Sequence, residues 1–310
     1  MDFFAVESQM IVLFLAMTLG FAARKFHIMG DEFDAALSKL VLSIALPCMI
    51  IASVITCDNL PAPEVIESIF FYSCVTYVAI VAIALIVPYA FRLEPSKRGS
   101  YQFMMAFGNT GFIGFPVLNS IYGSQAVLYG AILNIPFNVL VFTAGIMMLS
   151  EHEGSVRTQL KESAKRLINP CLVSCFLAMA FAILGVTNTG VVGEAVDTIG
   201  QMTTPAAMLI IGSSLAKLPI ITMITHFRTY IMAAFRLVII PVCVYFILRG
   251  IIADPMLLGV LVVTSGMPVA TNATLLCLQY GGDLNTIIRG TFVTTILSIF
   301  TIPFLATILL

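Results

Sequence analysis

The sequence predicts an all-α membrane protein with ten transmembrane helices arranged as two inverted five-helix repeats. The amino-acid composition predicts a membrane protein. Hydrophobic residues make up 60% of the chain and charged residues 10%, whereas soluble domains carry about 45–50% apolar and about 25% charged residues. The order of charges along the chain gives the number of spans, and motifs that recur at half the chain length give the repeat.

Long uncharged runs give ten candidate spans, because a helix needs roughly 20 apolar residues to cross a bilayer. They are residues 8–23, 40–57, 68–91, two spans within 99–150, 167–193, 198–216, 229–248, 255–282 and 284–310. Within the run 99–150, Tyr122, Gly123 and Ser124 form the expected turn between two spans. Two of these runs contain a single charge each, Arg236 and Arg289.

The distribution of basic residues supports this count, because cytoplasmic loops of membrane proteins collect Lys and Arg. Of the fifteen basic residues, twelve fall in one set of alternate loops and two lie within spans. The other set of loops holds Arg249 alone, together with eight acidic residues. We therefore expect a cell-membrane protein with both termini extracytoplasmic and residues 150–166 as the central cytoplasmic link. The first run lacks the basic flank of a signal peptide, so we expect it to be retained.

Three motifs recur in the same order at about half the chain length. They are Leu46-Pro47 and Thr204-Pro205 in spans 2 and 7, Gly114-Phe115-Pro116 and Gly266-Met267-Pro268 in spans 4 and 9, and Ile135-Pro136-Phe137 and Ile302-Pro303-Phe304 in spans 5 and 10. Five is an odd number of spans, so the second repeat (156–310) must run opposite to the first (1–155). Inverted repeats of this kind are typical of secondary transporters.

Spans 4 and 9 each combine glycine, proline and neutral polar residues in an uncharged stretch. Proline breaks helices, so we expect breaks near Pro116 and Pro268. The freed N–H groups cannot face lipid, and helix N-termini favour anions, so the two breaks predict one central binding site. The candidate binding residues are Asn109, Thr110, Gly111, Pro116, Asn134, Asn138, Met267, Pro268, Thr271, Asn272 and Thr274.

Several roles stay open at this point. Asn134 and Asn138 either line the site or bond a neighbouring helix. Arg236 and Arg289 lie near the cytoplasmic ends of their spans, so they either snorkel or act as counter-charges for an anion. We expect no metal centre, because the histidines fall in polar loops and the cysteines mostly in apolar runs. The spans hold no nucleophile–base pair and no diacid, so we expect no enzyme. The net charge of −1 argues against a nucleic-acid partner.

Four motifs together resemble the auxin efflux carrier family, whose bacterial members include malonate- and malate-type permeases. They are Leu46-Pro47, the segment from Gly108 to Pro116, the segment from Met267 to Asn272, and Tyr280-Gly281-Gly282-Asp283. The resemblance covers essentially the whole chain. It implies the fold of bile-acid symporters and sodium/proton antiporters, within the bile acid/arsenite transporter-like superfamily. It further implies a scaffold of spans 1, 2, 6 and 7, and an elevator-like transport domain of spans 3–5 and 8–10.

By this resemblance Asn109, Pro116, Pro268 and Asn272 are the crossover residues, and the substrate is a small organic anion. The short link 150–166 favours a microbial carrier over auxin export, and the lack of paired acids disfavours cation exchange. We expect a secondary transporter for a carboxylate such as malate, malonate or an auxin-like acid. Alternatives are a channel and a sodium-coupled organic-anion symporter. We expect no cofactor. The coupling ion (H+ or Na+) and a homodimer contact through spans 2 and 7 stay open.

Overall fold

The computed structural model describes residues 3–56, 60–91, 93–150, 170–187, 189–217, 226–271 and 273–308. Within these ranges the elements are helices, without a β-strand. The first half comprises α1 (Phe3–Lys25), α2 (Asp31–Leu40), η1 (Val41–Ala45), α3 (Leu46–Ile55), α4 (Pro63–Ala90), α5 (Pro95–Ala106), η2 (Thr110–Gly114), α6 (Phe115–Tyr122), α7 (Ser124–Leu140), η3 (Val141–Gly145) and α8 (Ile146–Leu149). The second half comprises α10 (Pro170–Leu184), α11 (Val191–Gln201), α12 (Thr203–Ala216), α14 (Phe227–Ala234), η4 (Phe235–Ile239), α15 (Ile240–Leu248), α16 (Pro255–Ser265), α17 (Ala273–Tyr280) and α18 (Leu284–Ile308).

Helices occupy every one of the predicted apolar runs, and several are continuous over the length of a bilayer. The long apolar segments are Asp31–Ile55, Pro63–Ala90, Ser124–Leu149, Phe227–Leu248 and Leu284–Thr307, while α10 and α16 are shorter apolar helices. The prediction of an all-helical membrane protein is thus confirmed. The number of ten crossings and the inverted-repeat relation stay predictions.

The helix is interrupted in both of the spans where we predicted a break, but one of the interruptions does not lie at the predicted position. α16 ends at Ser265 and α17 begins at Ala273, so Pro268 lies inside the break as predicted. α5 ends at Ala106 and the chain becomes helical again at Thr110, so the prediction of a break near Pro116 was wrong. Pro116 instead lies in the first turn of α6, where a missing N–H is tolerated.

Three prolines are accommodated by π-helical segments rather than by breaks. Each of the segments η1, η2 and η4 ends two residues before a proline, namely Pro47, Pro116 and Pro241. A π turn shifts the register of the backbone hydrogen bonds, so the helix continues past a residue that cannot donate one. The helices therefore continue through Pro47 and Pro241 without an interruption.

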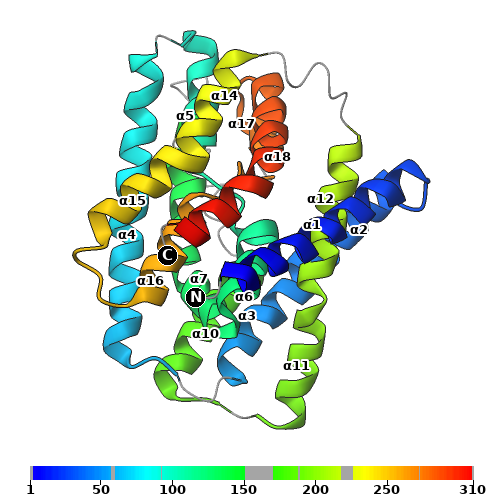
Figure 1. The fold of residues 1–310 in the computed structure, drawn as a ribbon, viewed down its shortest axis with the longest axis vertical. Coiled ribbons are helices and arrows are strands. Elements are labelled where there is room, and N and C mark those ends of the chain that lie inside the picture. The colour runs from blue at the N-terminus through cyan, green and yellow to red at the C-terminus, as the bar shows by residue number, and fades with distance from the viewer. Residues whose placement is uncertain are drawn as a thin grey trace.

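Helices α1 and α12 pack together at unusually close range on one side of the molecule (Figure 1). A Cβ on Gly212 would overlap the carbonyl oxygen of Met17, and a Cβ on Gly20 would overlap that of Leu209. Glycine at both positions is what lets the two backbones approach, as is common between membrane helices.

Hydrogen bonds and ion pairs also link α1 and α12 to α2, near the basic C-terminal ends of α1 and α12. The buried Asp34 accepts hydrogen bonds from Ser213 Oγ at 2.6 Å, and its Oδ2 lies 3.0 Å from Lys217 Nζ. Asp31 pairs with Arg24 at 2.8 Å and with Lys217 at 2.7 Å. The acids that open α2 thus bind cations of α1 and the end of α12, in addition to lying in the first turn of a helix.

We predict that Gly212→Val destabilises the protein by about 1–3 kcal/mol, because the new side chain has no room against α1. Thermal unfolding of the purified protein in detergent measures the change. Gly250→Val is the matched control, since a Cβ there meets no atom within 4 Å. Equal melting temperatures for the two variants would contradict the close packing of α1 on α12.

Candidate functional site

The two interrupted spans meet at their breaks and pair there as a short antiparallel bridge. Gly108 lies opposite Val269 in this bridge. The backbone N–H of Asn109 donates to the carbonyl of Pro268 at 2.7 Å, and that of Ala270 donates to the carbonyl of Phe107 at 3.2 Å. The pairing satisfies polar backbone groups that would otherwise lie unpaired at membrane depth.

Arg236 binds the remaining free carbonyls at this crossing. Its Nε donates to Met267 O at 2.8 Å, and one terminal nitrogen donates to Met105 O at 3.1 Å and Ala106 O at 3.2 Å. These carbonyls end or follow α5 and α16, where the helix dipole is negative, so a cation is favoured there. The side chain is 1% exposed.

Neither sequence interpretation of Arg236 was right. It does not snorkel, because the guanidinium lies inside the protein. It is not among the residues that line the cavity described below, and its Nε and one terminal nitrogen donate to the main chain. Gly108 makes room for it: a Cβ there would overlap the guanidinium and lie 3.1 Å from Met267 Cβ.

A cavity of about 210 Å³ lies beside the crossing. Its walls come from the π segments η1, η2 and η3, from α7, from the start of α10, and from the unwound residues after Pro268. The lining residues are Leu42, Ser43, Leu46, Gly108, Asn109, Thr110, Gly111, Phe112, Asn134, Phe137, Asn138, Phe142, Pro170, Cys171, Ala270 and Thr271. None of these side chains carries a charge.

The structure brings six of the predicted site residues together around this cavity: Asn109, Thr110, Gly111, Asn134, Asn138 and Thr271. Four others lie outside its walls. Pro116, Met267 and Pro268 are buried, and Thr274 is half-buried in α17. Asn272 lies outside the described residues.

The side-chain amide of Asn109 has one hydrogen-bonded atom and one unpaired atom. Its Oδ1 accepts from the backbone N–H of Phe112 at 3.0 Å and so caps the helix that begins at Thr110. Its Nδ2 is buried and has no hydrogen-bond partner among the described residues. A buried amide donor without a partner is costly, and an acceptor atom in the cavity would satisfy it.

Asn134 links the first interrupted span to a helix of the second half. Its Oδ1 accepts from Thr110 Oγ1 at 3.0 Å, and its Nδ2 lies 3.6 Å from Cys171 Sγ. Asn138 Nδ2 donates to the backbone carbonyl of Asn134 at 2.7 Å. Asn134 therefore lines the cavity and also bonds a neighbouring helix, so the two roles that the sequence left open occur together.

Ser43 and Cys171 are wall residues that sequence reasoning missed. Cys171 is one of the cysteines in apolar runs, which were assigned no role in the site from the sequence. Nothing in the sequence alone singles out Ser43, but the structure places it in a π segment, a form frequent at functional sites. Among the described residues, His, Cys, Asp and Glu side chains nowhere gather in a group of three that could hold a metal ion.

Arg289 lies away from this cavity, near the start of α18, where a guanidinium nitrogen contacts His226 Nε2 at 3.0 Å. It lines a separate cavity of about 430 Å³ with Lys97 and Arg228. The interpretation as a counter-charge in the central site was therefore wrong for Arg289, and its position at the polar end of the span agrees with the alternative.

We predict that Arg236→Met lowers stability by at least about 2 kcal/mol, because it leaves buried carbonyls without donors. Arg236→Lys keeps the charge but offers a single donor atom to three carbonyls, so we expect an intermediate loss. Thermal unfolding in detergent compares the variants. If Arg236→Met melts at the wild-type temperature, the guanidinium does not hold the crossing together.

Comparison with known proteins agrees with this architecture. The family model described as "Membrane transport protein" matches residues 5–306. An uncharacterized transporter of Methanocaldococcus jannaschii is 25% identical over 97% of both chains. A protein of Rhizobium meliloti named "Putative malonate transporter" is 26% identical over 92% of this chain and 89% of its own. An uncharacterized transporter of Escherichia coli, YfdV, is 24% identical over 67% of this chain and 68% of its own. The chain therefore belongs to the membrane transport protein family, that of the auxin efflux carriers, and is a multi-pass membrane protein.

Proposed function

We propose that the chain is a secondary transporter that carries a small carboxylate across the cell membrane, with its binding site in the cavity at the crossing. The observation that carries the proposal is the unpaired amide donor of Asn109 in a cavity free of charged side chains. The N-termini of the helices that begin at Thr110 and Ala273 lie at the same crossing, and helix N-termini favour anions.

The volume of the cavity supports a small metabolite as the transported substrate. Sites for drug-sized ligands have volumes of about 300–1,000 Å³, whereas this cavity measures about 210 Å³. A three- or four-carbon acid of the malonate or malate type suits it better than a larger aromatic or amphipathic acid. The relative from Rhizobium meliloti, named for malonate, supports the same class.

The coupling ion that we propose is a proton carried by the substrate itself. The described lining holds no carboxylate and no histidine that could take up a proton. The carbonyls of Met105, Ala106 and Met267 already accept from Arg236, and those of Phe107 and Pro268 from the opposite segment. Carbonyls engaged in this way are poor ligands for Na+, which disfavours the sodium-coupled alternative.

The proposed mechanism is an elevator motion of spans 3–5 and 8–10 against a scaffold of spans 1, 2, 6 and 7, with both termini extracytoplasmic. The antiparallel bridge between the two breaks supports inverted repeats. The close packing of α1 on α12 supports a rigid scaffold. The cavity lies between the proposed bodies, since α7 contributes Asn134 and α10 contributes Cys171.

We predict that Asn109→Asp strongly reduces transport without unfolding the protein. The carboxylate keeps the acceptor that caps η2, but it replaces the free donor and opposes an anionic substrate. A hydrogen bond to a charged group contributes about 1.5–3 kcal/mol, so kcat/KM should fall by at least about tenfold.

Uptake into proteoliposomes measures this effect, and melting temperature shows whether the cap survives. Asn285→Asp, at an exposed position in α18, is the matched control and should transport normally. Normal transport by Asn109→Asp would remove this residue from the site.

We further predict saturable uptake of radiolabelled malonate or malate that an inward proton gradient stimulates and a sodium gradient does not. Indole-acetate serves as the larger acid and should be a poor substrate. Stimulation by sodium would overturn the proposed coupling. Ion conductance without saturable uptake of any of the three acids would favour a channel.

A further inference from the structure

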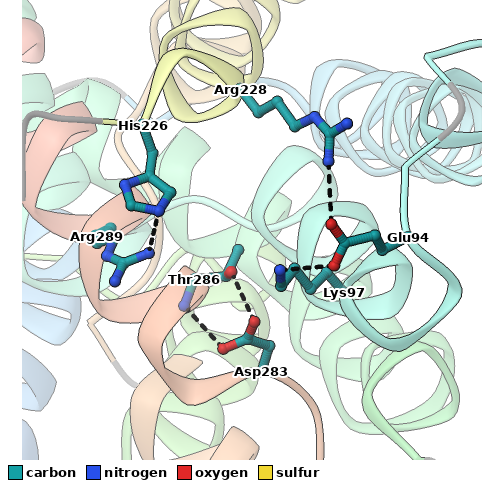
Figure 2. A network of polar contacts seen from close by, with 7 residues as sticks. All are labelled: Glu94, Lys97, His226, Arg228, Asp283, Thr286 and Arg289. Atoms are coloured by element: carbon teal, nitrogen blue, oxygen red, sulfur yellow. Dashed lines mark hydrogen bonds and ion pairs between the residues drawn. The ribbon is translucent and has the colours of Figure 1, made fainter.

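Another large cavity lies at the basic end of the molecule, away from the central site. It measures about 430 Å³ and lies where three helices begin: α5 after Glu94, α14 after His226 and α18 after Asp283. Figure 2 shows the two sides of this space, with Arg289 and His226 on one and Glu94, Lys97 and Arg228 on the other. Three helix N-termini and three permanent cations make the region attractive to an anion.

The carboxylates nearby are already engaged. Glu94 lies 2.6 Å from Lys97 Nζ and 3.5 Å from Arg228, and the bond from Lys97 lowers the pKa of Glu94. Asp283 caps α18 by accepting from the backbone N–H of Thr286 at 3.2 Å and from its hydroxyl at 3.0 Å.

Arg289 is the cation that these acids leave without a counter-charge. Within the part of the chain that the structure describes, no carboxylate lies within 4 Å of it. Its contact is with His226 Nε2 at 3.0 Å, and a histidine side chain carries no negative charge. An anion entering the cavity would therefore meet an uncompensated guanidinium.

A second cavity of about 170 Å³ adjoins the basic one and is apolar. The two share Leu93, Tyr101, Phe227 and Arg228 as walls. From there the apolar cavity continues between the end of α4 and the segment formed by α14 and η4. Its walls there include Phe91, Ile231 and Met232. Phe227 and Phe91 are exposed, so the apolar cavity borders the outer surface of the molecule.

We propose that these adjoining cavities bind an acidic phospholipid of the cytoplasmic leaflet, with its phosphate at Arg289 and an acyl chain in the apolar cavity. A basic pocket next to an apolar one matches a ligand with an anionic head and a hydrocarbon tail. Basic pockets between membrane helices on the cytoplasmic side are typical sites for anionic head groups. The inference rests on the proposed orientation in the membrane but not on the transported substrate, so a binding experiment tests it apart from transport.

The test uses native mass spectrometry of the full-length protein in detergent, titrated with dioleoyl phosphatidylglycerol or dioleoyl phosphatidylcholine. We expect wild type to prefer phosphatidylglycerol by at least about fivefold, and Arg289→Gln to lose that preference. Arg249→Gln is the matched control, since this arginine stacks on Tyr245 and Phe246 away from the cavity, and it should keep the preference.

A second variant tests the apolar half of the site. Ile231→Trp fills the apolar cavity without changing a charge, so we expect weaker binding of phosphatidylglycerol at an unchanged melting temperature. Glycerol phosphate tests for a soluble ligand and should not displace the lipid.

Three outcomes would overturn the proposal. They are equal phosphatidylglycerol binding by Arg289→Gln and wild type, equal losses in the Arg289 and Arg249 variants, and full displacement of the lipid by glycerol phosphate, which would indicate a soluble phosphate instead.

Discussion

The bond between one buried guanidinium and the carbonyls at the ends of two broken helices is the contact on which the rest of the structure depends. A helix that stops inside a bilayer leaves carbonyls that neither lipid nor water can satisfy. Arg236 satisfies those of Met105, Ala106 and Met267 together. It thereby joins spans 4 and 9 and places a positive charge where two helix dipoles are negative.

This arrangement separates the charge that stabilises the fold from the cavity that we propose as the binding site. Arg236 binds carbonyls at the C-terminal ends of the helices that precede the two breaks, whereas the helices that begin at Thr110 and Ala273 follow the breaks with their N-termini at the crossing. The cavity there is lined by amides, hydroxyls, a thiol and aromatic rings. A site without fixed charge binds an anion through neutral donors and helix N-termini, and such a site releases it more readily than one built on an arginine.

Helices α5 and α18 connect the crossing with the basic end of the molecule. α5 ends at the carbonyls that Arg236 binds and begins beside Glu94 and Lys97. α18 supports the crossing through Thr294, whose hydroxyl accepts from the backbone N–H of Val269 at 3.0 Å, and it carries Arg289 one turn earlier. A ligand at the basic end would therefore contact the same helices that hold the crossing.

The sequence alone determined the membrane class, the helical runs, the two interrupted spans and six residues of the cavity wall, because composition and proline position act within one segment. Tertiary structure decided the rest. The first break lies at residues 107–109 rather than near Pro116, since Asn109 caps η2 and pairs with Pro268 across the crossing. Arg236 and Met105 are 131 positions apart, and Asn134 and Cys171 are 37 apart. Which carbonyls an arginine reaches, and which serine or cysteine faces a cavity, depends on segments that meet only in the folded chain.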